Sequence, residues 1–243
     1  MRQEIHLCWS IIIKIIVVIC FCVGFTMSYL YGHVNGITNL LYFTNQSNIW
    51  IALFDFIIIF YMMYLLLHKR YEVNHIVYKI QQVLTVCISI TGLVYNLVLV
   101  PAFYLSNIEG PTGYTPFSLA AVLLHIVVPI LSVFDFFMFT RHVDFKYKDS
   151  LYSLIPTGYY FIFSLIGYLL NWDFGDGRNY PYFFLNYDSP AGIFGFSNTM
   201  PYFMGTFYWI ILLSGITIGL SALIIKLIKI IIHHRETHHI TNN

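Results

Sequence analysis

Six long apolar stretches run through this sequence, and they constrain the fold more than any other feature. A helix that crosses a bilayer needs about 20 mostly apolar residues, because the hydrocarbon core is roughly 30 Å thick and each residue adds about 1.5 Å. The six predicted spans cover residues 9–31, 47–67, 80–104, 118–140, 151–170 and 205–232. All are too long for membrane β-strands, so the predicted fold class is all-α, a polytopic bundle of six transmembrane helices.

Composition agrees with a membrane location. Only 9% of the residues are charged and 58% are hydrophobic, whereas a soluble domain is about 25% charged. The net charge of +1 and the lack of a long basic run exclude an electrostatic nucleic-acid interface. We therefore predict one domain over residues 1–243, with a polar cytoplasmic tail at 233–243.

The basic residues predict the orientation, because Lys and Arg concentrate in cytoplasmic loops. Arg2 and Lys14 are interpreted as flanking the first span, and the others except Arg178 lie in the second and fourth connections or at the end of the chain. Both termini are therefore expected in the cytoplasm of a multi-pass cell-membrane protein. The first span lacks a cleavage site and is interpreted as a retained helix, not a signal peptide.

The fifth connection, residues 171–204, is much longer than the usual loop of about 4 to 6 residues. Its aromatic run Tyr180-Pro181-Tyr182-Phe183-Phe184-Leu185 and its glycines favour an ordered segment. We expect it to fold over the outer mouth of the bundle or to dip partly into the membrane interface, with Tyr180, Tyr182 and Phe183 lining or capping a substrate pocket.

Polar residues inside the predicted spans are the candidate functional residues, because such side chains are costly in a membrane and usually face the bundle interior. Thr44, Asn48 and Asp55 fall on one helical stripe. Asn96 and His125 lie roughly 12 and 10 Å below the outer ends of their helices, so they are expected to approach Thr44 in depth.

Simpler interpretations stand beside the functional ones. A membrane threonine most often bonds its own backbone or a neighbouring helix. His125 can donate to a carbonyl that Pro129 leaves free. Asp55 and Asp135 lie nearer the cytoplasmic side, where they are interpreted as structural residues that pair with loop cations.

Two motifs carry a family resemblance: Tyr42-Phe43-Thr44-Asn45-Gln46-Ser47-Asn48 and Leu124-His125-Ile126-Val127-Val128-Pro129. With the aromatic run of the fifth connection, they resemble bacterial six-span integral membrane proteins distantly related to the animal androgen-induced and androgen-dependent membrane hydrolases. The resemblance implies a bacterial plasma membrane, a membrane lipid or lipid ester as substrate, Thr44 as nucleophile and His125 as its base, cleaving fatty-acid esters of hydroxy fatty acids.

That chemistry is self-consistent, because a neutral histidine can take the proton of a threonine hydroxyl near neutral pH. Asn45, Asn48 and Asn96 are candidate donors to the oxyanion, and one such donor contributes about 3 kcal/mol. The alternative is a non-catalytic lipid-binding or transport protein with the same polar pocket. The sequence indicates no metal site, no cofactor and no particular protein partner.

Overall fold

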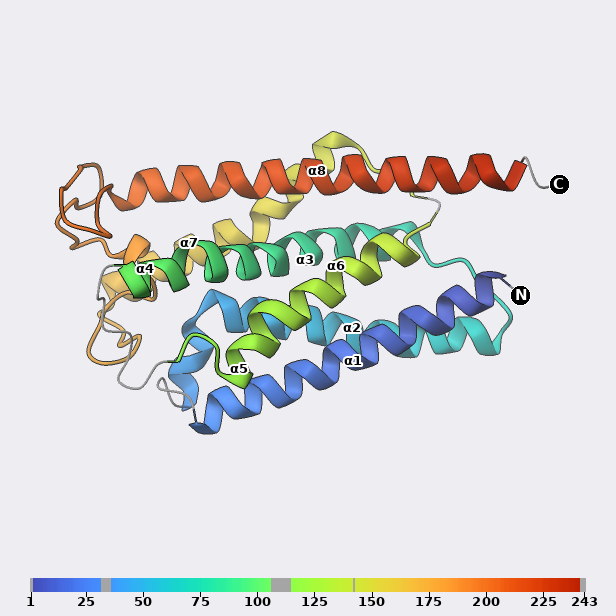
Figure 1. Ribbon diagram of the computed structural model, residues 1–243, viewed down its shortest axis with the longest axis horizontal. Helices are drawn as coiled ribbons and strands as arrows, with labels where there is room; N and C mark the ends of the chain where they lie inside the picture. The colour runs from blue at the N-terminus through green and yellow to red at the C-terminus, as the bar shows by residue number, and fades with distance from the viewer. Residues whose placement is uncertain (1, 32–35, 106–114, 142, 241–243) are drawn as a thin grey trace.

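The computed structural model describes residues 2–31, 36–105, 115–141 and 143–240, and this part of the chain is all-helical (Figure 1). Its α-helices are α1 (Arg2–Tyr31), α2 (Phe43–Leu67), α3 (His75–Val94), α4 (Val100–Leu105), α5 (Leu119–Val122), α6 (Val128–Phe139), α7 (Leu154–Leu169) and α8 (Thr206–Ile240). Short 3-10 helices are η1 (Gly36–Leu41), η4 (Tyr147–Ser153) and η5 (Phe183–Leu185). Two π-helical turns, η2 (Tyr95–Leu99) and η3 (Leu123–Val127), interrupt the third and fourth predicted spans.

Five helices in the described residues are long and apolar enough to cross a membrane. They cover residues 4–31, 43–67, 75–104, 119–139 and 206–235. Large apolar side chains such as Ile57 and Ile211 are more than half exposed on the outward faces, as expected where a bundle faces lipid. The all-helical membrane character predicted from the sequence is therefore confirmed.

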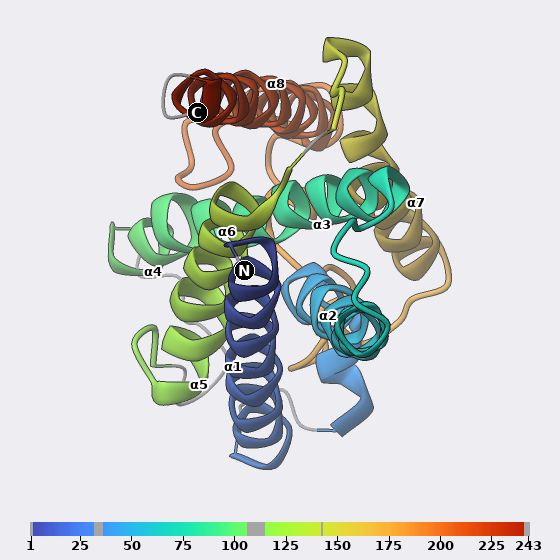
Figure 2. The same ribbon diagram turned by 90° about the vertical axis from the view of Figure 1, so that its right-hand side faces the viewer.

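The fifth predicted span has a different form. It consists of the 3-10 helix η4 followed by α7, which has 16 residues and is about 24 Å long. Because α7 is shorter than a full crossing, the sixth span remains a prediction. The start of α1 and the end of α8 lie at the same end of the molecule (Figures 1 and 2).

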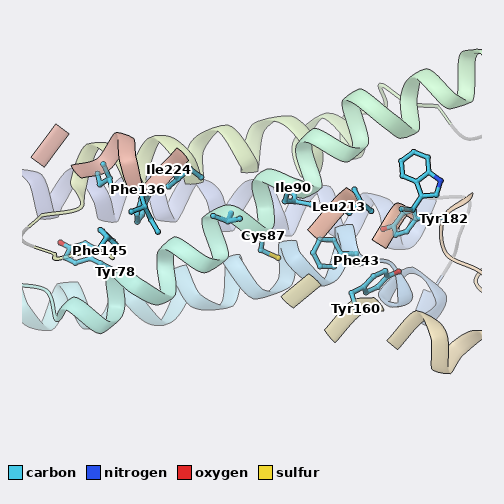
Figure 3. Packing of buried hydrophobic residues seen from close by; sticks show 14 of the residues in the cluster. Phe43, Tyr78, Cys87, Ile90, Phe136, Phe145, Tyr160, Tyr182, Leu213 and Ile224 are labelled. Atoms are coloured by element: carbon cyan, nitrogen blue, oxygen red, sulfur yellow. The ribbon is translucent and has the colours of Figure 1, made fainter. Parts of the chain in front are cut away.

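Helices α1, α2, α3 and α6 pack together, and α7 and α8 lie on the other side of α3 (Figure 2). Between α1, α2, α3 and α6 is an apolar layer in which Val17, Ile51, Ile88 and Val128 are almost completely buried. A second cluster follows α3 and α8, from Phe136 near the end with the termini toward the opposite end (Figure 3).

The long fifth connection is ordered and lies at the end of the bundle opposite the termini (Figure 1). Phe174 and Leu185 are fully buried, and Arg178 is the only Lys or Arg in the connection. Helix α8 continues through Ile240, so the start of the predicted polar tail is helical. Residues 32–35 and 106–114 of the first and third connections, and 241–243 of the tail, lie outside the described residues.

Candidate functional site at the start of helix α2

A mostly apolar pocket lies where the start of α2 meets α3, α7, α8 and the fifth connection. Figure 3 shows Phe43, Ile90, Tyr160, Tyr182 and Leu213 gathered around this region. The lining residues are Phe43, Thr44, Ile90, Thr91, Val94, Thr157, Tyr160, Phe161, Tyr182, Phe184, Leu185, Leu213 and Thr217. Such a lining, apolar with a few polar groups, is typical of small-molecule sites.

Thr44 is the second residue of α2, and Tyr182 holds its position. The backbone N–H of Thr44 donates to the Tyr182 hydroxyl at 3.2 Å, and that hydroxyl in turn lies 3.5 Å from Thr44 Oγ1. The residue before the helix, Tyr42, makes no side-chain cap. Tyr182 therefore satisfies a backbone N–H that a capping side chain would otherwise bind.

Four threonines line the pocket, and their hydroxyls differ in how they are used. Thr217 Oγ1 donates to Leu213 O at 2.8 Å, and Thr157 Oγ1 lies 3.3 Å from the carbonyl oxygen three residues before it. Thr91 Oγ1 lies 2.6 Å from Ser47 Oγ. Thr44 stands in the first turn of α2, where no earlier turn of the same helix offers its hydroxyl a carbonyl. In the described structure the Thr44 hydroxyl accepts one hydrogen bond, from Tyr182, so its own proton remains available to a ligand.

His125 lies in the π-helical turn η3 and is fixed by its neighbours. Its Nδ1 is 2.9 Å from the Ala121 carbonyl, and its ring stacks on Tyr95 with centroids 3.8 Å apart. A carbonyl only accepts, so Nδ1 carries the proton, and in the neutral ring Nε2 is then the basic nitrogen. The π-helical turn itself is a feature often found at functional sites.

The structure does not bring Thr44 and His125 together. No hydrogen bond joins them in the described part of the chain, and His125 does not line the pocket. On α3, Thr91 faces the pocket while Gly92 faces η3, where a Cβ on it would come within 3.1 Å of the His125 carbonyl oxygen. Helix α2 and η3 are in direct contact through Asn48 and the Leu124 carbonyl, but Thr44 lines the pocket and the His125 ring stacks on Tyr95 instead.

The three asparagines predicted as oxyanion donors are committed to backbone or neighbouring side chains. Asn45 Nδ2 donates to Asn39. Asn48 Nδ2 donates to the carbonyls of Thr44 and Leu124, and Asn96 Nδ2 donates to those of Gly92 and His125. These bonds tie α2 and α3 to η3, which gives Asn48 and Asn96 a structural role.

Of the three aromatic residues expected to line or cap the pocket, only Tyr182 lines it. Phe183 packs edge-on against Trp209, and Tyr180 also lies outside the lining. Phe184 and Leu185 take their places in the lining. The 3-10 helix η5, from Phe183 to Leu185, explains why the lining residues differ from the predicted ones. It points successive side chains in different directions, and the aromatic composition alone does not predict these directions.

A second polar site lies in the half of the bundle nearer the termini, and its centre is Lys14. This residue is 1% exposed, and its Nζ is 2.9 Å from Asp55 Oδ1 and 2.6 Å from Asp135 Oδ2. Ser10 and Gln81 also donate to Asp135, at 2.7 and 2.6 Å. The expectation that Lys14 flanks the first span and that the two carboxylates pair with loop cations is therefore corrected.

The signal that could have identified Lys14 is its position. Apolar residues enclose it in the first predicted span, and two aspartates occur in other predicted spans. A buried charge is stable only when paired, so one intramembrane cation and two intramembrane carboxylates predict each other. Gln81 and Ser10 carried no such signal, because amide and hydroxyl side chains are common at helix contacts.

Comparisons with protein-family models, with curated proteins and with solved structures found nothing that matches this chain. The family resemblance inferred from the two motifs thus remains a prediction, and the function rests on the geometry.

Proposed function

We propose that this protein binds a membrane lipid, with an acyl chain in the pocket between α2, α3, α7 and α8. The observation that carries the proposal is the Thr44 hydroxyl, whose proton is unused in an otherwise apolar lining. A hydroxyl at one end of an apolar pocket matches a lipid, whose ester or headgroup accepts hydrogen bonds while its chain is apolar. The positive end of the α2 dipole adds to the attraction for that polar group.

A photoactivatable phosphatidylcholine with a diazirine in one acyl chain tests the binding. In purified protein reconstituted in nanodiscs, it should cross-link to the α3 and α8 segments around Ile90 and Leu213. Leu213→Phe, which adds bulk to the pocket wall, should reduce this cross-linking several-fold. Leu212→Phe is the matched control, because Leu212 is 44% exposed and faces outward. Equal cross-linking of both variants, each eluting as a folded monodisperse protein, would exclude this pocket as the lipid site.

The second candidate is hydrolysis of a lipid ester with Thr44 as nucleophile and His125 as base. The observation that favours it is the fixed tautomer of His125, which leaves Nε2 as a base. The reaction requires the His125 ring to leave Tyr95 and turn toward Thr44, a rearrangement in which η2 and η3 would have to change their turns. Asn96 lies in η2 and donates to the carbonyls of Gly92 and His125, so it would move with these turns.

Labelling with a lipophilic fluorophosphonate separates the two candidates. A hydrolase is labelled in the wild type and in Thr44→Ser at a reduced rate, but not in Thr44→Ala or His125→Ala. The double variant should be little worse than either single one, because residues that act as a unit are non-additive. A binding protein is not labelled at all, and its cross-linking falls in Thr44→Ala but not in His125→Ala.

We also propose that the chain crosses a bacterial plasma membrane six times, with both termini in the cytoplasm. The common position of the two chain ends and the basic residues at that end of the bundle support this topology. In a background without the four native cysteines, Asn198→Cys should react with an impermeant maleimide from outside, and Lys148→Cys only after permeabilisation. The reverse pattern would reject the orientation.

A further inference from the structure

The charges of the Lys14 cluster do not balance. Lys14 contributes one positive charge, and Asp55 and Asp135 contribute two negative charges when ionised. All three side chains are at least 95% buried. In the described ranges, both ion pairs of these carboxylates are with Lys14. An uncompensated charge at this depth is strongly unfavourable, so one bound proton is needed to neutralise the cluster.

In the described residues, no further Lys, Arg, Asp or Glu forms an ion pair with the cluster, although Arg141, just after α6, interacts with the Tyr78 hydroxyl at its edge. Helix α1 contributes Lys14, and α2 contributes Asp55. Helix α3 contributes the amide of Gln81 and the hydroxyl of Tyr78, which donates to a carbonyl of α6 at 3.4 Å. Helix α6 contributes Asp135. The neutralising proton must therefore be bound by one of the two carboxyl groups, Asp55 or Asp135.

Hydrogen bonding distinguishes the two carboxyl groups. Asp135 accepts from Ser10, Lys14 and Gln81 at 2.6 to 2.7 Å. Asp55 accepts only from Lys14, at 2.9 Å, in the described structure. Donors stabilise the ionised form of a carboxyl group, so Asp135 is the carboxylate. We propose that Asp55 holds an exchangeable proton, which makes the interface of α1, α2, α3 and α6 a proton-binding site inside the membrane.

Two further buried side chains support an exchangeable proton. Thr85 lies one turn from Gln81 on α3, and Ser132 lies one turn from Asp135 on α6, both on the side away from the termini. Their hydroxyl oxygens are buried and have no hydrogen-bond partner in the described structure. These two hydroxyl groups are unused hydrogen-bond donors one turn from residues of the cluster. Beyond them, the apolar layer around Ile51 separates the site from the lipid pocket.

Infrared difference spectroscopy between neutral buffer, in which exposed carboxyl groups are ionised, and alkaline buffer tests the proposal on the reconstituted full-length protein. The wild type should show the carbonyl stretch of a protonated carboxylic acid that disappears in alkali and shifts in heavy water. Asp55→Asn should abolish this signal, because it leaves Lys14 and Asp135 as a neutral pair. Asp144→Asn is the control, since Asp144 is an exposed carboxylate outside the bundle. Thr44→Ala should also leave the signal unchanged.

Thermal unfolding identifies which carboxyl group carries the proton. The asparagine of Asp55→Asn resembles the protonated acid, so the melting temperature of this variant should stay close to that of the wild type and lose the part of its pH dependence that comes from this cluster. Asp135→Asn should melt markedly lower, because an amide cannot accept from three donors as a carboxylate does. Absence of a protonated-acid signal in the wild type, or its persistence in Asp55→Asn, overturns the proposal. A milder effect of Asp135→Asn than of Asp55→Asn overturns the assignment to Asp55.

Discussion

The Lys14 cluster, nearer the termini, and the Thr44 pocket, nearer the opposite end, are both polar sites inside a membrane bundle, yet they use their polar groups in opposite ways. In the cluster, α1 and α3 contribute three short hydrogen bonds to one carboxylate of α6, Asp135. In the pocket, the Thr44 hydroxyl accepts one bond of 3.5 Å from Tyr182 and donates none. The first arrangement holds helices together, whereas the second leaves bonding capacity for a ligand. The two sites therefore differ in how many hydrogen bonds their polar groups are still free to make, more than in how polar those groups are.

The largest expected effect comes from Lys14→Met in the cluster. Removing one partner of a buried ion pair costs about 3 to 5 kcal/mol, and here two carboxylates lose their common cation. We expect a large fall in melting temperature in detergent at neutral pH, with partial recovery in acid as the remaining carboxylate, Asp135, takes up a proton. Lys226→Met, at an exposed position of α8, is the control. A small effect at neutral pH would show that the cluster does not stabilise the bundle.

An intermediate effect is expected from Tyr182→Phe in the pocket. The change removes the hydroxyl that accepts from Thr44 N and donates to its side chain. An unsatisfied buried donor costs about 1 to 3 kcal/mol, and the loss should appear in the melting temperature. Tyr180→Phe, outside the pocket lining, should change both stability and lipid cross-linking much less. Equal effects of the two substitutions would contradict the capping role of Tyr182.

The smallest effect is expected from an ion pair that is partly exposed at the surface of the bundle. Lys79 pairs with Asp149 at 3.1 Å, but the Lys79 side chain is 34% exposed. Such a pair contributes about 0 to 1 kcal/mol, so Lys79→Met should lower the melting temperature far less than Lys14→Met. A comparable loss from both would mean that burial does not separate these two ion pairs.

The Lys79–Asp149 pair also has a defined pH dependence. Burial alone would raise the pKa of Asp149, but the backbone N–H of Lys146 and the Lys79 ammonium outweigh it, so the pKa is lowered. A carboxyl group with a lowered folded-state pKa stabilises the fold above its unfolded pKa and loses this contribution as the pH falls through the folded value. Asp149→Asn should therefore reduce the loss of stability on acidification. An unchanged acid limb of the melting curve would contradict this assignment.

Much of the bundle could be predicted because hydrophobic length and helical periodicity act locally. The stripe of Thr44, Asn48 and Asp55 was expected to face inward, and all three are buried. The relation between Thr44 and His125 could not be predicted in this way. Periodicity shows which face of its own helix a residue occupies, but not which neighbouring element that face meets: Thr44 meets Tyr182 and the pocket, and His125 meets Tyr95.

The π-helical turns add a second reason. Each turn inserts a residue into the helical repeat, which rotates every later side chain relative to a regular α-helix. His125 lies inside such a turn. The placement of Lys14 at the flank of the first span was wrong for a different reason. The rule that Lys and Arg concentrate in cytoplasmic loops holds for whole loops, and it does not decide whether a single lysine near a helix end lies inside or outside the membrane.

The short helix α7 has a consequence for the surrounding lipid. Its roughly 24 Å length falls several ångströms below the average hydrocarbon thickness of about 30 Å, while the neighbouring α8 is much longer. A short hydrophobic segment is accommodated by local thinning of the bilayer. Thr157, Tyr160 and Phe161 of α7 line the pocket, so the thinned annulus would bring headgroups and their esters toward the pocket wall. Hydrophobic mismatch would then select which lipids gather at this flank of the protein before any of them enters.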